Sequence, residues 1–448
     1  MQYKKLSLLI LSTALLANSE VNNFSEVFSE AKVSGEIKYY YIQTDKEHAN
    51  TADTSAKTNS IGGELSFDTA SLYGVSAGVT FMTTNPFLLN DNPAKVDTSL
   101  IGKDNGVRGG DATDGFSVLG EAYLAYHYAD FDFTLGRKAM KTPLVHSKYV
   151  RMMPSTVEGL FGSYSLNEKS NIEVAYLSRF KQRTSDEFID IIEHALGANT
   201  KAVTGSNGGY VAMLGLNYAQ DKISIKAYDY YADDFINSLY LDTSYKTKLS
   251  DTQVSFAGQY IHQRSIGNAD TNLAQAGSLT GGKKINVNAF GFKASARLSD
   301  AKIILAYSKV LKDDAKHDSV ILPWDGTPLF ANSITSNDLF QSIYGSALKS
   351  DSIYIGGSQG IKIAYNQKFD SLGMKGFSTM LSYLNTSNSR FVKNQHDYNL
   401  VFGYKYDKHF SLVLKGIWVK NNTGADATGA ITQLKQLSQY RVITNYKF

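Results

Sequence analysis

The sequence contains no cysteine, only 6 prolines and almost no long apolar runs. Without cysteine the chain cannot form disulfide bonds, thiolate nucleophiles or cysteine metal sites. After the first residues no apolar run approaches about eighteen residues, and the mean hydropathy of −0.24 is too polar for a bundle of membrane helices. The formal net charge of +3 comes without a long basic run, so no nucleic-acid partner is expected.

Catalytic and metal-binding motifs are also missing. The sequence has no HExxH or P-loop pattern, and its 8 histidines are scattered. Asp104, Asp111 and Asp114 lie in a glycine-rich stretch that offers oxygen ligands for Ca²⁺, but the EF-hand spacing is absent and a solvated loop is favoured. We therefore expect no enzyme, no catalytic residue, no bound metal and no cofactor.

The amino terminus has the features of an export signal. Lys4 and Lys5 precede an apolar run over residues 6–16, which is too short to cross a bilayer, and Ala17-Asn18-Ser19 supplies small residues for cleavage. We predict a signal peptide over residues 1–19, cleaved after Ala17 or Ser19, and one mature domain over residues 20–448. The exported chain is then either a soluble protein or a β-barrel.

Alternation of apolar and polar residues dominates the mature chain and reaches its very end. In residues 440–448, Tyr440, Val442 and Tyr446 share one parity, while Arg441 and Lys447 share the other. This period of two predicts a strand, which taken alone also fits a soluble sandwich. About eighteen such segments occur, over residues 32–42, 60–69, 73–83, 117–128, 130–138, 157–166, 170–181, 209–219, 222–232, 235–246, 251–264, 286–298, 301–311, 359–369, 375–387, 396–406, 409–420 and 438–448.

The connections between these segments alternate in length. Tight turns such as Ala129-Asp130 and Ser299-Asp300 alternate with long loops over residues 84–116, 182–208 and 312–358. Residues 232–234 form a short connection where a long one is expected. Short turns at one rim and long loops at the other are typical of outer-membrane barrels. We predict an all-β, transmembrane antiparallel β-barrel of about eighteen strands in the bacterial outer membrane, with long extracellular loops and short periplasmic turns.

Aromatic residues support this orientation. Strands that descend to the periplasm should end in an aromatic girdle at the level of the lipid headgroups. The outward residues at these ends are Tyr126, Tyr128, Tyr164, Tyr218, Tyr245, Phe369, Tyr404, Tyr406, Tyr446 and Phe448.

The opposite parity carries an excess of cations that we expect to line the lumen. A confined pore concentrates solutes of the opposite charge, although a wet wall also needs polar residues that simply pair across strands. The candidate basic pore-lining residues are Arg179, Lys181, Arg183, Lys293, Arg297, Lys362, Lys405, Lys415 and Arg441.

The loop over residues 136–159 differs from the others by its apolar content. Leu144, Val145, Met152 and Met153 would be unfavourable in open water, so we predict that this loop folds into the barrel and constricts it. The alternative is an ordinary packed surface loop. The charged or titratable candidates for the constriction are Lys141, His146, Lys148, Arg151 and Glu158.

The same region resembles the signature segment of the OprD family of outer-membrane porins, particularly its epsilonproteobacterial members. The resemblance rests on 135–137 (Leu-Gly-Arg), 142–143 (Thr-Pro), 151–154 (Arg-Met-Met-Pro) and 156–159 (Thr-Val-Glu-Gly), together with the strand number and terminal Phe448. It implies an eighteen-stranded barrel with a narrow eyelet, a ladder of basic residues and uptake of small solutes, often carboxylates or amino acids. Arg151 and Glu158 would then lie in or beside the constriction, with Arg179, Lys181 and Arg183 on the adjoining wall. Family members often carry an acidic residue just before Arg151, where Tyr149 and Val150 stand here.

These observations predict a passive diffusion porin for small hydrophilic solutes, favouring anions or carboxylate and amino-acid-like compounds. The alternative is a surface adhesin or structural barrel that binds through the long loops at 84–116 and 312–358. An energy-driven receptor would need a plug domain, for which residues 20–31 are too few. The expected partners are outer-membrane lipid and lipopolysaccharide, small solutes and the barrel assembly machinery, recognised through the terminal strand ending in Phe448. A homotrimer is one expected assembly, and monomers are the alternative.

Overall fold

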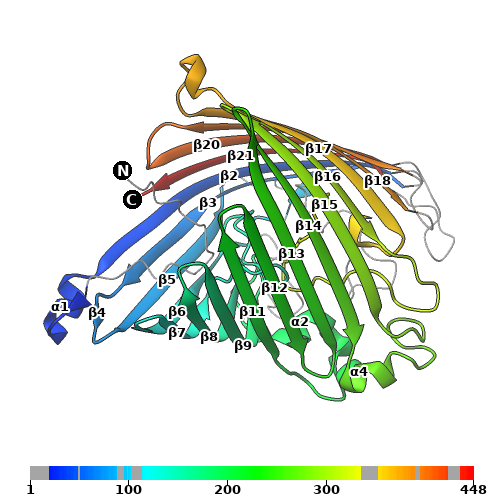
Figure 1. Cartoon of the computed structure of the whole chain (residues 1–448), viewed down its shortest axis with the longest axis horizontal. Helices are drawn as coiled ribbons and strands as arrows, with labels where there is room; N and C mark the ends of the chain where they lie inside the picture. Colours follow the sequence, from blue (N-terminus) through cyan, green and yellow to red (C-terminus); the bar gives the residue numbers. More distant parts are fainter. Residues whose placement is uncertain are drawn as a thin grey trace.

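A computed structural model describes residues 20–48, 51–87, 95–97, 99–101, 114–333, 352–388, 394–421 and 434–448. The predicted signal peptide and the stretch containing Asp104 and Asp111 lie outside these residues. The chain forms one antiparallel β-barrel, whose long tilted strands follow one another around the wall (Figure 1). None of the helices in the described ranges is long and apolar enough to cross a membrane.

Eighteen long strands make the wall, and three two-residue strands add to it locally. Each long strand pairs in an antiparallel manner with the next long strand along the chain. The long strands are β2 (Lys32–His48), β3 (Thr54–Asp68), β5 (Val75–Pro86), β6 (Phe116–Tyr128), β7 (Phe131–Lys138), β8 (Thr156–Asn167), β9 (Ser170–Lys181), β11 (Val211–Gln220), β12 (Ile223–Ala232), β13 (Ile236–Leu249), β14 (Thr252–Ser265), β15 (Asn286–Leu298), β16 (Ala301–Val310), β17 (Ser358–Lys368), β18 (Phe377–Asn388), β19 (Gln395–Lys405), β20 (Phe410–Asn421) and β21 (Leu434–Lys447).

The first and last strands close the barrel. β2 pairs with β21 from Glu36 opposite Lys447 onward, and the two strands lie side by side in Figure 1. The backbone of Phe448 continues this ladder, since it exchanges two hydrogen bonds of 3.1 Å with Gly35. A Cβ atom at Gly35 would lie 2.5 Å from the Phe448 ring, so glycine lets the terminal ring lie against β2. Closure leaves no unpaired edge for lipid to meet.

Tight turns join the strands at the periplasmic rim. Ala129, Asp221, Ser250 and Ser299 each follow a descending strand with φ between 48° and 53°. Positive φ at the first loop residue matches the right-handed twist of the flanking strands, which is why such turns suit short hairpins. The short connections predicted at these places are therefore confirmed.

The outward face is apolar and ends in aromatic rings at the periplasmic side. Tyr128, Tyr406 and Phe448 are exposed there, as are Tyr126, Tyr164, Tyr245 and Tyr446. A short amino-terminal segment adds to this rim. β1 (Glu20–Val21) pairs with β4 (Ser71–Leu72), and α1 (Phe24–Ser29) follows it at the edge of the barrel (Figure 1).

The remaining short elements lie in the loops. They are β10 (Ile189–Asp190), α2 (Ile191–Leu196), η2 (Gly197–Asn199), α3 (Thr200–Thr204), α4 (Gly267–Asn272), η3 (Ser352–Tyr354) and η4 (Asp370–Leu372). The short connection after β12 is explained by its neighbours: Phe235 is fully buried, Asp233 N donates to Tyr210 O, and the Asp234 carboxylate accepts from Asn268 N. Flanking loops cover this hairpin, so it needs no long loop of its own.

Candidate functional site: the lumen and its two inner loops

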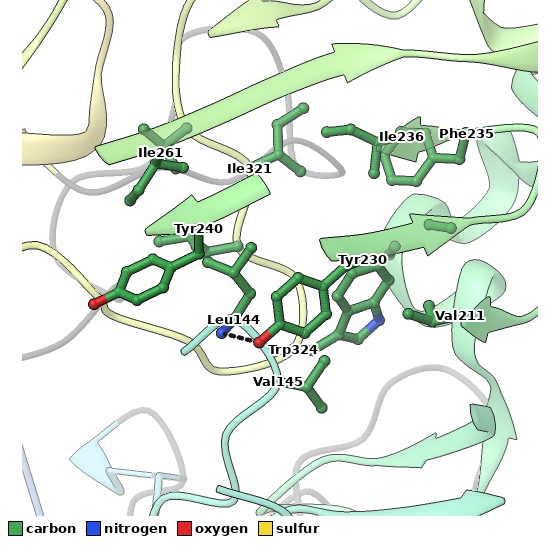
Figure 2. Close-up of a cluster of buried hydrophobic side chains, with 14 of the residues drawn as sticks. Leu144, Val145, Val211, Tyr230, Phe235, Ile236, Tyr240, Ile261, Ile321 and Trp324 are labelled. Atoms are coloured by element: carbon green, nitrogen blue, oxygen red, sulfur yellow. Dashed lines mark hydrogen bonds between the residues drawn. The ribbon is translucent and has the colours of Figure 1, made fainter. Parts of the chain in front are cut away.

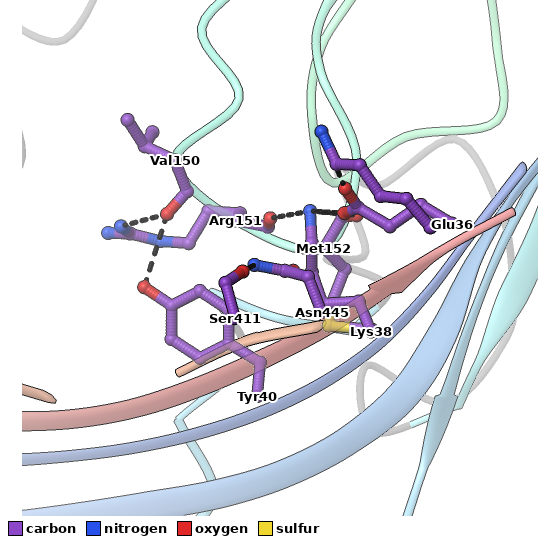
Figure 3. Close-up of polar contacts among 9 residues, drawn as sticks. Glu36, Lys38, Tyr40, Val150, Arg151, Met152, Ser411 and Asn445 are labelled. Carbon is purple, nitrogen blue, oxygen red and sulfur yellow. Dashed lines mark hydrogen bonds and ion pairs between the residues drawn. The ribbon is translucent and has the colours of Figure 1, made fainter. Parts of the chain in front are cut away.

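Residues 139–155, the first inner loop, lie against the inner face of β2. Lys38 Nζ donates to the carbonyl oxygens of Arg151 and Met152, each at 3.3 Å, and its ammonium group stands 3.3 Å above the Tyr149 ring. Tyr40 OH donates to Val150 O at 3.2 Å (Figure 3). Lys38 and Tyr40 share one parity of β2, the buried one, which faces the lumen. Two wall side chains therefore hold the loop backbone inside the barrel.

The same loop also reaches β12. The backbone N of Leu144 donates to Tyr230 OH at 3.3 Å, and both residues are buried in one apolar cluster (Figure 2). β2 is the first long strand and β12 the ninth of eighteen, so they stand on opposite sides of the wall. The first inner loop therefore crosses the lumen.

Apolar side chains anchor this crossing. Leu144 and Val145 pack in the large cluster, Met152 packs with Tyr40 and Ile42, and Met153 packs with Met82. All four loop residues are at most 3% exposed. The prediction that these side chains bury against the wall is confirmed, because burial removes from water the surface that made the loop unusual.

A second inner loop, residues 311–333, follows the inner wall beside the first. Gln263 Nε2 donates to Ile321 O at 2.9 Å, Phe330 N donates to Gln259 Oε1 at 2.7 Å, and Lys362 Nζ donates to Asn332 O at 2.6 Å. These partners lie on β14 and β17. The described part of the loop predicted at 312–358 is thus bound to the wall, whereas the adhesin alternative assigned surface binding to this loop.

The two inner loops meet each other. Val145 and Asp325 form an antiparallel β-bridge, and His146 N donates to Trp324 O at 2.9 Å. Lys148 Nζ is hydrogen bonded to Thr327 Oγ1. Trp324 lies beside Tyr230 and Val145 in Figure 2. The loops therefore form one partition that is fastened to the wall at several points.

The charged residues predicted for the first inner loop have different environments. Lys141 is exposed, whereas Arg151 is only 7% exposed. Burial and the neighbouring Lys148 lower the pKa of His146, so this ring is neutral at pH 7 and adds no charge. Glu158 belongs to β8 and accepts from Arg137 Nε at 2.8 Å, at the base of the loop.

Three cations converge where the first inner loop meets the wall. Arg441 on β21 donates to Gln439 Oε1 at 2.7 Å and lies 3.5 Å from Tyr40 OH through its Nη1 atom. Lys415 on β20 pairs with Arg441 across the ladder, and Tyr40 OH contacts both Arg441 and the carbonyl of Val150, which brings the adjacent Arg151 close to the two wall cations. We call Arg151, Lys415 and Arg441 the cation cluster. Glu36 lies further along the same ladder, 3.1 Å from Lys38 Nζ and 3.4 Å from Lys447 Nζ.

The other predicted wall cations in the upper lumen contact the inner loops. Lys181 is fully buried and donates to Pro154 O at 3.0 Å, and Arg183 forms an ion pair of 3.2 Å with Asp325. Lys293 Nζ lies 3.9 Å from the centre of the Phe330 ring. These side chains help to hold the partition in place.

The alternation of inward and outward side chains along β9 is interrupted before Arg179. A β-bulge shifts the register of β8 and β9 between Gly159 and Glu158, so that both Leu177 and Phe180 are buried in the inner cluster. Strict alternation from Val174 and Tyr176, which are both exposed, would place Phe180 on the lipid face as well. The Arg179 side chain is 53% exposed and lies 3.9 Å from Glu158, so the simple parity that put it on the lumen wall fails at this bulge. Arg297 and Lys405 are exposed near the periplasmic ends of β15 and β19.

Several residues that hold or form the inner loops were not identified from the sequence. Tyr40 and Tyr230 were assigned no role, although they hold opposite ends of the first inner loop. Trp324, Asp325 and Phe330 lie in a long loop that was assigned to the outside. The sequence does contain a pattern that indicates an inward-folded loop. Residues 320–324 read Val-Ile-Leu-Pro-Trp, an apolar run as unsuited to open water as that of the first inner loop.

The described residues offer no group of three or more His, Cys, Asp or Glu that could hold a metal ion. A small cavity of about 60 Å³ lies at the start of the first inner loop, lined by residues that include Asp132, Lys138, Lys141 and Glu173. Its mixture of charges offers hydrogen-bond donors and acceptors to a passing solute. Nothing in it resembles a catalytic constellation.

Comparison with known proteins identifies the family. The family model described as "outer membrane porin, OprD family" matches residues 25–448. Pseudomonas aeruginosa OccK9 (OpdG) is similar in structure, with a TM-score of 0.71 and 16% identity over 94% of this chain and 99% of that one. A BenF-like porin from Pseudomonas fluorescens Pf-5 gives 0.71 and 11% over 94% and 99%.

Pseudomonas aeruginosa OpdK, solved with vanillate, gives a TM-score of 0.69 and 15% identity over the same shares of the two chains, 94% and 99%. No curated protein is significantly similar in sequence. The family match covers nearly the whole chain, and the solved porins share the closed eighteen-stranded barrel. The chain therefore belongs to the OprD family of outer-membrane porins, channels for small solutes.

Proposed function

We propose that this porin passes small hydrophilic solutes by passive diffusion and favours anions, carboxylates in particular, where the two inner loops narrow the lumen. The observation that carries the proposal is the cation cluster of Arg151, Lys415 and Arg441 beside the crossing loop. Charges in a confined, partly dehydrated passage act on a solute more strongly than they do in open water. A carboxylate gains attraction there, while a cation of equal size is repelled.

We include amino-acid-like solutes in this proposal. Glu36 stands on β2 between Lys38 and Lys447, six residues along the β2–β21 ladder from Arg441, so this wall carries both signs of charge. A solute with both an ammonium and a carboxylate group can interact with both signs as it moves along the wall. We infer no chemical step on the solute, and no cofactor enters the proposal.

Swelling of liposomes that contain the purified channel tests the preference. Benzoate, vanillate, benzyl alcohol and benzylamine supply rings of similar size that differ in charge. The carboxylates should enter roughly threefold faster than benzylamine. A threefold difference in rate corresponds to a barrier to entry that is about 0.7 kcal/mol higher for the cation. K415Q and R151Q should narrow this difference, whereas K309Q, on the outward face of β16, should not. Equal rates for anion and cation in the unaltered channel would refute the preference.

We further propose export through the signal peptide over residues 1–19, contact with outer-membrane lipid and lipopolysaccharide, and recognition of the terminal strand by the barrel assembly machinery. Phe448 supports the last point, because its 51% exposed ring ends the closing strand at the periplasmic rim. A homotrimer and the epsilonproteobacterial type remain proposals from sequence. Sedimentation in detergent distinguishes trimer from monomer.

A further inference from the structure

A groove runs over the outward face of the barrel, away from the lumen. It has a volume of about 440 Å³ and crosses β17, β18, β19 and β20. Its lining is almost wholly apolar and includes Ile363, Leu381, Tyr383, Tyr398, Leu400 and Trp418. Because this face of an outer-membrane barrel meets lipid, the groove has the surroundings and the polarity that suit a hydrocarbon chain.

The upper end of the groove lies in the half of the barrel nearer the extracellular side. Tyr404 stacks on Phe377 near the periplasmic turns, with ring centres 4.4 Å apart. Tyr398 is six residues further along β19. At about 3.3 Å per residue and a tilt of about 40°, it stands roughly 15 Å above Tyr404. The apolar band of such barrels is about 25 Å tall, so Tyr398 belongs to the level of the outer leaflet.

The groove is held open by the arrangement of its own side chains. A Cβ atom at Gly416 would lie 2.4 Å from the Trp418 ring, so the indole lies flat over this glycine. Its Nε1 atom donates to Tyr440 OH at 3.3 Å, which fixes the orientation of the ring. Tyr383 and Tyr398 stand with ring centres 5.1 Å apart. Aromatic groups locked in this way make a site that exists before its ligand arrives.

A polar pair stands directly above the apolar lining. His396 faces Lys420 across β19 and β20, two residues beyond the pair formed by Tyr398 and Trp418 and on the same outward parity. Lys420 is exposed. His396 Nδ1 lies 2.8 Å from Tyr383 OH and accepts from Asn385 Nδ2 at 3.3 Å, which leaves Nε2 as an N–H donor. On the same scale this pair stands roughly 20 Å above Tyr404, so a lysine side chain that extends upward from it reaches the headgroup level.

We infer that this groove binds an acyl chain of a phosphorylated glycolipid of the outer leaflet, lipid A, with a phosphate against Lys420 and His396. Charge complementarity at Lys420 and the continuity of the groove with the membrane identify this occupant. An acyl chain fills the apolar channel below the headgroup, and the phosphate accepts from the ammonium group and from Nε2. The site is separate from solute transport and makes the porin a specific lipid-binding protein.

Fluorescence of Trp418 tests the inference directly. The chain has 2 tryptophans, and Trp324 is buried between the inner loops, so W324F leaves one reporter in the groove. In a brominated maltoside detergent, bromine in the groove quenches Trp418. Added bis-phosphorylated lipid A should restore the emission in a saturable manner, at one lipid per chain. Should W324F fold poorly, the unaltered chain serves, because Trp324 is only 3% exposed and gives a constant background.

Lipid analogues and variants distinguish the contribution of the lipid headgroup to binding from that of the acyl chain. The concentration at half-saturation should be about fivefold higher for lipid A without phosphates than for the bis-phosphorylated form, and K420Q should remove this difference. K309Q, on the outward face of β16 outside the groove, should leave the fivefold difference unchanged. G416A should weaken both lipids alike by displacing the indole. The inference is overturned if recovery rises linearly without saturation, or if phosphatidylethanolamine competes as well as lipid A, since either result means ordinary annular lipid.

Discussion

At the scale of single residues, the lumen holds its charges through contacts with the loops that cross it. Lys38 is 3% exposed, yet it has Glu36 at 3.1 Å, two backbone carbonyls and the face of Tyr149 around it. A buried ammonium group is tolerated only with such partners. Lumen cations such as Lys38, Lys181 and Lys362 therefore hold the inner loops through hydrogen bonds to their backbone. Sequence reasoning from alternation named most of these residues without revealing this role.

Local irregularity limits what alternation can predict. Parity assigned Lys415 and Arg441 to the inner face, and both lie near Arg151 there. It failed at Phe180 and Arg179 because one extra residue in β9 reverses the pattern. A bulge leaves no clear mark in the sequence, since it depends on the pairing of two strands. The side of the wall that a residue faces can therefore be assigned only from the structure when the residue lies within a few positions of a bulge.

His317 provides a prediction for pH. This fully buried side chain lies where the loops meet: its N donates to Lys284 O at 2.9 Å, and Asn286 N donates to its O at 3.1 Å. Burial, and then the nearby Lys283, lower the pKa of His317 to about 4. When the contact opens, the His317 side chain has its ordinary pKa of about 6.5 and binds more protons than when the contact is closed. The contact therefore weakens as the pH falls from about 6.5 to 4.

Hydrogen exchange at the Asn286 amide measures this weakening. After correction for the intrinsic rate, exchange through opening of the contact should speed up by as much as tenfold per pH unit below 6.5. H317Q cannot take up this proton and should show a flatter profile over the same range. An unaltered steep profile in H317Q would assign the effect to another group.

At the scale of elements, the two inner loops differ in how far the sequence revealed them. The first was predicted to fold inward because Leu144, Val145, Met152 and Met153 interrupt a polar stretch. The second was assigned to the outside with the other long polar loops, and its apolar residues 320–324 were not considered. Its inward path depends on Gln259 and Gln263, whose side chains bind its backbone. Such contacts between distant segments have no local signature.

Tyr40 tests the attachment of the first inner loop to β2. Y40F removes the hydrogen bond to Val150 O, worth about 1 kcal/mol, so the loop should move more freely. Single-channel recordings should show greater noise in the open state than for the unaltered channel. Y39F is the matched control, because Tyr39 lies on the outward parity and binds Asn59 instead. Equal noise in Y40F and Y39F would mean that this contact does not hold the loop.

A disulfide tests the meeting of the two inner loops. The chain contains no cysteine, so V145C/D325C forms the only possible pair, at positions that face each other in a β-bridge. Mild oxidation should crosslink the pair rapidly and leave the conductance of the reduced form unchanged, because the loops already touch. D325S controls for the lost ion pair with Arg183. Failure to crosslink, or a conductance that changes sharply on oxidation, would contradict the contact.

At the scale of the whole molecule, the barrel was the most predictable feature. Alternating parity, turns and loops of alternating length and a terminal aromatic all repeat many times along the chain, so errors at single positions hardly affect the conclusion. The structure extends the first hairpin beyond its expected end, to Lys46 opposite Thr54. Closure by β2 and β21 follows from the same pattern, because hydrocarbon tolerates no open edge.

The most direct test of the account is the reversal potential of single channels in a planar lipid bilayer under a tenfold gradient of potassium chloride. A porin whose narrow passage lies beside Arg151, Lys415 and Arg441 should give steady openings, a linear current–voltage relation and a reversal potential displaced toward that of chloride. K415Q should move it back toward zero. A reversal potential displaced toward that of potassium in the unaltered channel would contradict the central claim that the cation cluster governs permeation.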